Sequence, residues 1–309
     1  MVFCPFISVW PCCGVLFHTI NGMELWEPKP ADWENISRET IENHKNYCRK
    51  FVANFPNASE DFEYLREFKH FRDSKISRFI YDSNRFEDAG VGEMETKAIC
   101  ERLLSGVQVR NPSVKERETI NHLLTYLQSL QYLPDGILSI ADICQLHKTL
   151  MQGIDDSAGS LRIKPACAGM DTQYPNPSSV PILLKKVLLC FNDLDKNLHV
   201  SPYAKAAWLK CRFVEVHPFE DGNGRLSRIL LNWVLFKHGI HFPVAIASDG
   251  HKQVKKHYMQ SLKRALSGRS PGNFSYLVLR SVYNSIKDFE SVVASASNSP
   301  GYTHGNDAT

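Results

Sequence analysis

The amino-acid sequence predicts an all-α fold with one short β-hairpin. Three observations support this prediction. Apolar side chains recur at helical spacing through most of the chain, serine or proline stands where several helices would begin, and periodicity fails within the body of the chain only at 155–177. The chain has 309 residues, of which 43% are apolar and 22% charged. It is therefore long enough to bury the core of one or two domains.

Both ends of the chain differ from its body. Residues 1–30 begin with an apolar stretch that has no basic residues before it and is interrupted by Pro5, Pro11 and Gly14. It is a poor match to a signal peptide and too broken for a membrane span. We expect a poorly ordered extension there, with a targeting segment or a start site placed too early as alternatives. Residues 290–309 end in a small, polar stretch that predicts a disordered tail.

Charge and cysteine content narrow the class of protein. The formal net charge is +3 and no run of lysine and arginine stands out, which argues against a nucleic-acid partner. Nine scattered cysteines do not resemble a disulfide framework. We therefore expect a cytoplasmic or nuclear protein and no membrane partner. The sequence leaves open whether the chain forms a homodimer.

Residues 31–137 are predicted to be a helical lead-in. Ser37 is a candidate N-cap for its first helix, and the aromatic residues between 62 and 71 are expected to lie in the core. Amphipathic helices are predicted over 93–104 and 115–130. These segments have the pattern of a scaffold.

Within this lead-in, the segment from Phe79 is helical up to a stop at Gly90. Ser83 and Glu87 are four residues apart and share a helix face. Taken alone, Glu87 is a solvated residue near a helix end.

Five further helices are predicted from Leu138 onward. The first covers 138–153, with Ser139 as N-cap and His147 on its inner side. His147 has no second metal-binding residue at helical spacing, so we interpret it as a core or surface histidine. The other helices are expected over 180–194, 202–216 with Pro202 at its first position, 226–238 and 251–266.

Between the first two of these helices, 160–164 and 166–168 are candidates for two short strands. An exposed strand edge offers unpaired N–H and C=O groups to an extended peptide. An ordinary connector is the alternative for this segment.

The loop between the helices at 202–216 and 226–238 has the composition of an anion-binding turn. Gly222 and Gly224 flank Asn223 just before a helix, where glycine permits successive N–H groups to face one point. Arg225 and Arg228 are three residues apart and share a face of that helix. Cations at this end oppose the helix dipole unless an anion is bound.

The same loop contains a candidate metal ligand and a candidate base. The carboxylate of Asp221 suits Mg²⁺ when phosphates and water complete its octahedron. His217 has a side chain that can take a proton from a hydroxyl near neutral pH. A lone histidine before proline is usually structural, but its spacing to the rest favours phosphoryl or nucleotidyl transfer.

The stretch from His217 to Arg228 resembles the His-x-Phe-x-Asp/Glu-Gly-Asn-Gly-Arg-x-x-Arg signature of the Fic (fido) family at all twelve positions. The resemblance implies an all-α Fic fold and transfer of AMP from ATP to a Ser, Thr or Tyr hydroxyl of a protein. It implies that His217 is the base and Asp221 the Mg²⁺ ligand. It also implies that phosphates are bound by Gly222, Asn223, Gly224, Arg225 and Arg228.

The segment at 83–88 resembles the family's inhibitory motif, Ser/Thr-x-x-x-Glu-Gly/Asn. The resemblance implies that Glu87 pairs with Arg228 and so competes with the nucleotide. Asp88 departs from the motif, where the family has Gly or Asn. Asp tolerates a left-handed conformation less well than Gly, so this helix end could differ.

Other parts of the family site map onto weaker matches. The segment near 160–170 resembles the flap that holds the target peptide, and Gly169 matches a position near the adenine. Tyr258 matches a tyrosine that approaches the nucleotide base. The resemblance places the catalytic domain at 138–281.

Two other functions stay open on the sequence. One is removal of AMP from a modified protein, with Glu87 orienting a water molecule. The other is a catalytically silent module that binds nucleotide or protein, against which the intact His217 and Asp221 argue.

Overall fold

A computed structural model describes residues 20–31, 34–55, 62–133, 137–168, 172–246 and 252–297. Within these ranges the regular secondary structure is helical except for one two-stranded hairpin. The helices are α1 (Arg38–Ala53), α2 (Phe62–Arg85), α3 (Glu93–Leu104), α4 (Val114–Tyr132), α5 (Ile140–Met151), α6 (Val180–Asp195), α7 (Pro202–Val216), α8 (Asn223–Lys237), α9 (Lys252–Leu266) and α10 (Pro271–Ser297), with the 3-10 helices η1 (Ile20–Leu25) and η2 (Pro177–Ser179). The predicted all-α class is confirmed.

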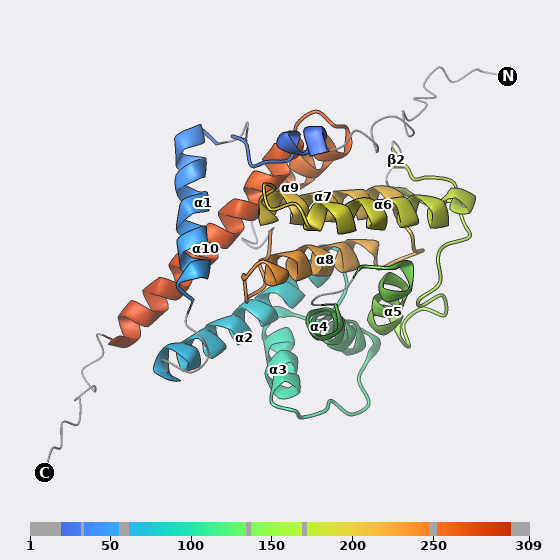
Figure 1. Ribbon diagram of the computed structural model, residues 1–309. Coiled ribbons are helices and arrows are strands. Elements are labelled where there is room, and N and C mark those ends of the chain that lie inside the picture. The colour runs from blue at the N-terminus through green and yellow to red at the C-terminus, as the bar shows by residue number, and fades with distance from the viewer. Residues whose placement is uncertain are drawn as a thin grey trace, which may run out of the picture.

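Helices α7 and α8 lie side by side at the centre of the molecule (Figure 1). The side chain of Ser201 caps α7 and Pro202 is its first residue, as the sequence predicts. Helix α8 begins at Asn223, three residues before the predicted start at Leu226. The reason is that Gly222 adopts a left-handed φ of 75° and turns the chain directly into the helix.

The other helices pack around this pair. Helix α6 lies against α7, while α4, α5 and α2 lie against α8 (Figure 1). Helix α10 runs along α1, α7 and α9. The lead-in and the segment 138–281 therefore share two hydrophobic clusters, the larger of which contains Phe68 and Phe71 of α2, buried as predicted.

Parts of both predicted disordered ends are folded. Residues 20–31 belong to the folded body, because Trp26 is buried and the Glu27 carboxylate accepts the N–H of Ser201 at 2.7 Å. At the other end, α10 continues to Ser297, so the prediction of a disordered tail is wrong over 290–297. Residues 1–19 and 298–309 lie outside the described part of the chain.

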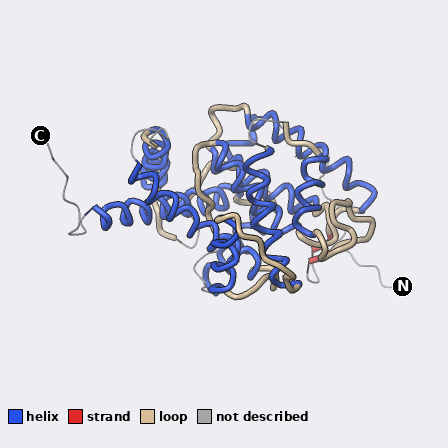
Figure 2. Tube along the Cα trace, turned by 90° about the horizontal axis from the view of Figure 1, so that it is seen from below, coloured by secondary structure: helices blue, strands red, loops and turns tan. Residues whose placement is uncertain are grey.

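The β-hairpin exists, and its first strand lies within the predicted 166–168, but the other strand follows it in the chain and does not lie at 160–164. Strand β1 (Cys167–Ala168) pairs antiparallel with β2 (Thr172–Gln173). The predicted strand at 160–164 is not formed, because the backbone N–H of Arg162 donates to the carbonyl of Pro218 and not to a neighbouring strand. Figure 2 shows the hairpin at the opposite end of the molecule from the C-terminal end of α10.

Helix α2 ends in a turn that is fixed by α4. Asp88 adopts a left-handed φ of 53°, so the residue that departs from the inhibitory motif still makes the expected turn. The Glu118 carboxylate accepts the N–H of Gly90 at 2.7 Å, and Lys115 Nζ donates to the Asp88 carbonyl at 2.7 Å. Two side chains of α4 therefore hold the backbone just after α2, one by accepting an N–H and one by donating to a carbonyl.

No helix in the described ranges has the length and apolar character that a bilayer span requires.

Candidate functional site

The signature loop begins at a strained residue. His217 ends α7 with a left-handed φ of 49°, which is uncommon for a side chain with a Cβ. Its N–H donates to the Phe213 carbonyl at 3.0 Å, and its own carbonyl accepts Nε of Arg162 at 2.6 Å. Backbone strain of this kind persists only where the surroundings hold it in place.

The turn into α8 is braced by its asparagine. The Asn223 side chain bonds both the N–H and the carbonyl of Phe219, at 3.0 and 2.8 Å. The Asn223 side chain therefore closes the loop and is occupied by these two hydrogen bonds. A side chain at Gly222 would be disfavoured, because the φ of this residue is left-handed and a Cβ would make tight contacts, 3.1 Å from Met151 Sδ and 3.2 Å from His147 Nε2.

His147 is part of this support, which the sequence analysis did not foresee. Its ring stacks on Phe219 with centroids 3.6 Å apart. Its Nδ1 accepts the N–H of Gly159 at 2.9 Å, so Nε2 carries the proton that is donated to the Asp221 carbonyl at 3.0 Å. Burial lowers the pKa of His147 to about 4, because protonation would place a charge in the core. A partner 74 residues away leaves no local signal in the sequence.

Arg225 and Asp221 form an ion pair beside the turn at 222–224, which is called the cradle below. Nη2 of Arg225 lies 3.0 Å from Oδ2 of Asp221, whose carboxylate is 64% exposed. Arg225 is itself buried, and its Nε and Nη1 have no hydrogen-bond partner within the described part of the chain. Two unsatisfied nitrogens on a buried guanidinium are costly in a finished core and are typical of a site that receives an anion.

Arg228 is held by Ser83 and Glu87, two residues of the segment at 83–88. Its Nε donates to Ser83 Oγ at 2.7 Å, and its Nη2 donates to the Ser83 carbonyl at 2.9 Å and to Glu87 Oε1 at 2.8 Å. The guanidinium also lies 5.3 Å from the Phe86 ring centroid. The structure thus brings Ser83 and Glu87 together with Arg228, 145 and 141 residues away in the sequence.

The Glu87 carboxylate also lies against the start of α8. A Cβ added to Gly224 would overlap that carboxylate. The N-cap residue of α8, Gly222, has no side chain that could accept an N–H of the first turn. Negative charge at a helix N-terminus is favoured by the dipole, so the carboxylate lies where the loop would receive phosphate oxygens.

The imidazole of His217 is neutral at physiological pH. Burial lowers its pKa to about 4, and the charge of Arg162 acts in the same direction. Nδ1 is buried without a hydrogen bond of good geometry, although the Val214 carbonyl lies close enough to favour protonation. The ring of Tyr174, which directly follows β2, stacks on the imidazole with centroids 3.7 Å apart.

The two weaker predicted positions are less informative. Gly169 lies outside the described residues. Tyr258 is buried and its ring centroid lies 5.0 Å from that of Phe86, which in turn lies over Arg228. It therefore borders the site through an intermediate ring.

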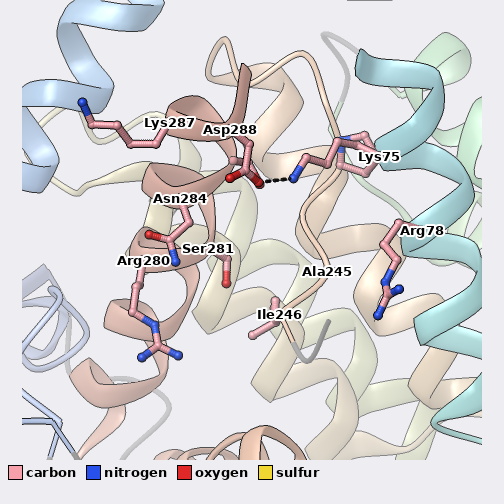
Figure 3. A pocket seen from close by; sticks show the side chains of 11 residues that line it. Lys75, Arg78, Ala245, Ile246, Arg280, Ser281, Asn284, Lys287 and Asp288 are labelled. Atoms are coloured by element: carbon pink, nitrogen blue, oxygen red, sulfur yellow. Dashed lines mark hydrogen bonds and ion pairs between the residues drawn. The ribbon is translucent and has the colours of Figure 1, made fainter. Parts of the chain in front are cut away.

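A cleft of about 310 Å³ lies apart from the signature, between α2, α10 and residues 243–246 (Figure 3). Its basic side chains already have acidic partners: Lys75 pairs with Asp288 at 2.8 Å across the cleft, and Arg280 pairs with Glu34 at 2.8 Å. We therefore assign the candidate site to the signature loop, where the charges converge.

Comparison with known proteins identifies the family of this chain. A family model described as the Fic/DOC family matches residues 137–235. A fido domain-containing protein of Dictyostelium discoideum is 35% identical over 143 residues, which cover 45% of this chain and 96% of that protein. The protein adenylyltransferase fic-1 of Caenorhabditis elegans is 29% identical over 211 residues, covering 64% of this chain but 39% of the relative.

Solved structures show the same fold. A Fic domain-containing signalling protein from Bacteroides thetaiotaomicron superposes with a TM-score of 0.66 at 21% identity, covering 82% of this chain and 98% of that one. Fic-1 from C. elegans gives a TM-score of 0.61 at 22% identity, covering 82% of this chain and 73% of that one. At these identities the two structures bear on the fold alone. The family model covers the segment that carries the signature, and the Dictyostelium relative is matched over almost its whole length, so the chain belongs to the Fic/DOC family.

Proposed function

We infer that this chain is a protein adenylyltransferase that transfers AMP from ATP to a Ser, Thr or Tyr hydroxyl of a target protein and is restrained by Glu87. The observation that carries this inference is the convergence of a buried arginine pair, a helix N-terminus and a neutral histidine on one loop. Relatives named protein adenylyltransferase, of which the chain spans little more than a third, support the same activity.

In the proposed reaction His217 acts as general base. Its pKa of about 4 leaves the imidazole unprotonated at neutral pH, so it can accept the proton of the target hydroxyl. The hydroxyl oxygen forms a bond to the α-phosphorus of ATP while the bond from that phosphorus to the pyrophosphate oxygen breaks. The products are AMP-modified protein and pyrophosphate, and the proton resides on His217.

Arg225, Arg228 and the first N–H groups of α8 would hold the triphosphate. The fit rests on a carboxylate from Glu87 lying in that cradle, because a cradle that accepts carboxylate oxygens suits phosphate oxygens. Arg225 has unused donors for the same purpose. A guanidinium can bind two phosphate oxygens at once, which fixes orientation as well as charge.

Asp221 is the residue that would hold Mg²⁺. Its carboxylate is exposed and gives one oxygen to Arg225. The described residues contain no cluster of three or more His, Cys, Asp or Glu side chains able to hold a metal, so phosphate and water would complete the shell. When bound, the ion would neutralise phosphate charge.

Glu87 is proposed to restrain the enzyme in its present conformation. Its carboxylate takes the Nη2 of Arg228 that would otherwise face a phosphate and lies against Gly224 in the cradle. Like charges repel, so a triphosphate in its productive position would have to displace this carboxylate. Removal of the carboxylate should therefore release activity.

Label transfer from ATP tests the proposal. The purified chain and its Glu87→Gly and Glu87→Gly/His217→Ala variants are incubated with α-labelled ATP, Mg²⁺ and a cell lysate. We expect protein label with Glu87→Gly, little with the unchanged chain and none with the double variant. Absence of label from all three, with ATP binding retained, would favour a silent module. Loss of AMP from a pre-modified protein that requires Glu87 would favour the reverse reaction.

A further inference from the structure

One buried arginine that the sequence analysis did not identify ties the signature loop to the hairpin. Arg162 lies between α5 and β1 and is 3% exposed. Its backbone N–H donates to the Pro218 carbonyl at 2.9 Å, which anchors it beside the first residues of the signature. The backbone of Arg162, from which the side chain extends, is therefore held in place.

The guanidinium of Arg162 bonds three backbone carbonyls. Nε donates to His217 at 2.6 Å, Nη1 to Lys164 at 3.0 Å and Nη2 to Pro175 at 2.6 Å. Lys164 precedes β1 and Pro175 follows β2, so the acceptors are the two legs of the hairpin and the catalytic residue. The planar fork of arginine can reach all three, whereas the single ammonium of lysine cannot take this geometry.

This arrangement is expensive as a purely structural device. No carboxylate pairs with Arg162 in the described ranges, and burial lowers the pKa of its guanidinium. Carbonyl dipoles alone compensate the buried charge. A neutral side chain could hold a loop at lower cost, which indicates that the charge and the three-way geometry have a further use.

The same contacts fix the histidine. His217 holds a left-handed φ of 49°, and its carbonyl is the one bound by Arg162 Nε. On the other side of the imidazole, Tyr174 stacks on the ring, and the Tyr174 N–H donates to the Ala166 carbonyl at 3.1 Å in the hairpin. The imidazole is thus held at its backbone and at its ring face by elements that Arg162 joins.

We propose that Arg162 is a positioning residue that joins the hairpin and His217 into one rigid unit, so that a target peptide paired with the hairpin edge is set in a fixed relation to the imidazole. This rests on the proposed function. Arg162 does not contact the reacting atoms in this scheme. It acts through the backbone of His217 and through the two legs of the hairpin.

Two variants separate geometry from charge. Arg162→Lys keeps a positive charge but loses the fork, and Arg162→Gln loses both the charge and most donors. The charged groups that face His217 besides Arg162 are Glu87 and Asp221, which both favour the protonated ring, while Tyr174 covers its face. Removal of the Arg162 charge should therefore raise the pKa of His217, and Arg162→Lys should raise it less.

The kinetic arm uses Glu87→Gly as background and α-labelled ATP. We expect both variants to lower kcat by about 100-fold, the loss typical of a misplaced catalytic group, with the KM for ATP changed less than about threefold. Arg280→Gln is the control, because it removes a paired guanidinium of α10 that lies apart from the site. Unchanged kcat in a folded Arg162→Lys variant would overturn the proposal.

Two further measurements do not need activity. NMR titration of labelled histidines reports the pKa of His217 in each variant, and an unchanged value in folded Arg162→Gln contradicts the electrostatic contact. In the unchanged chain, hydrogen exchange measures the protection factors of the Tyr174 and Arg162 amides. The two factors should agree within about tenfold, because the two amides open together in a rigid unit. Exchange at Tyr174 that is faster by several orders of magnitude would overturn the rigid unit, even if the variants fail to fold. A chain without transferase activity would fail only the kinetic arm.

Discussion

At the scale of single residues, the two arginines of the signature, Arg225 and Arg228, differ in their hydrogen-bond partners. Arg228 finds its partners in the inhibitory segment, through Ser83 and Glu87. Arg225 keeps two buried nitrogens without partners in the described part of the chain. The contrast indicates that the inhibitory segment satisfies one arginine of the signature and leaves the other prepared for an anion.

Ser83→Ala tests the contact to Arg228. The change removes the hydroxyl that accepts from Nε at 2.7 Å and leaves that buried donor unsatisfied. We expect the free energy of unfolding to fall by about 1–3 kcal/mol and basal label transfer to rise. Denaturant unfolding measures the first effect. Ser281→Ala, which removes a hydroxyl bonded only within α10, is the control and should change label transfer little.

The pH dependence of transfer tests the state of His217. Its neutral form is the base, and that form is lost only as the pH falls through about 4. Glu87→Gly removes a negative charge that favours protonation, which lowers this pKa further. In that variant kcat/KM should stay level from about pH 8 down to about pH 5.5, with folding followed by circular dichroism. An acid limb centred near the ordinary histidine value would contradict burial of the base.

At the scale of elements, the inhibitory segment depends on α4 as much as on the active site. Glu118 and Lys115 hold the backbone of Gly90 and Asp88 just beyond Glu87. Their effect on the carboxylate is indirect, because they fix the turn that aims it. The turn at 88–90 therefore links α4 to the signature, because it sets the position of the Glu87 carboxylate that contacts Arg228.

Glu118→Ala should release the inhibitory turn. Loss of a charged hydrogen bond of this kind costs about 1.5–3 kcal/mol, so the released form should gain about tenfold or more in population. Basal label transfer by the otherwise unchanged chain is expected to rise accordingly. Glu116→Ala is the matched control on the same helix, since Glu116 caps α4 with Ser113 and does not contact the turn. Equal activation by both variants would show general loosening of α4.

Helices were predictable from the sequence because their signals are local. The serine caps at Ser37, Ser139 and Ser201 each accept an N–H of the first helical turn, as their spacing indicates. One strand of the hairpin was predicted within 166–168, but β2 was missed because a strand of two residues has no periodicity to detect. The serine-capped helices are therefore predictable from local patterns, whereas α10, the longest described helix at 27 residues, was not predicted.

The site was predictable only in part for the same reason. Twelve consecutive residues carry the signature, and Ser83 and Glu87 match a short motif, so both could be found in the sequence. The supports contributed by Arg162 and His147 depend on partners 55 and 74 residues away. Their roles follow only from the fold.

At the scale of the whole molecule, α2 packs into two hydrophobic clusters that also contain residues of α8, so the helix that leads to Glu87 is integral to the fold. Buried histidines make this fold sensitive to acid. His147 stays neutral down to a pKa of about 4 in the folded chain, whereas in the unfolded chain it takes up a proton near its ordinary value. Stability contributed in this way is complete at neutral pH and is lost as the pH falls from about 6.5 toward 4.

His147→Gln should reduce this acid sensitivity. Between pH 7 and pH 4.5 the free energy of unfolding should fall less in the variant than in the unchanged chain, by about 2–3 kcal/mol. The variant should also be less stable at pH 7, because it loses the ring that stacks on Phe219 and braces the loop. Urea unfolding at both pH values measures the difference. His199→Gln, at an exposed histidine, should leave the pH dependence unchanged.

The most direct test of the central claim compares ATP labelled at the α-phosphate with ATP labelled at the γ-phosphate. Both are given to the unchanged chain, to Glu87→Gly and to Glu87→Gly/His217→Ala, with the same protein targets. The account predicts that protein acquires label only from α-labelled ATP, only with Glu87→Gly, and not with the double variant. Label acquired from the γ-phosphate, or equal labelling by the unchanged chain and Glu87→Gly, would contradict it.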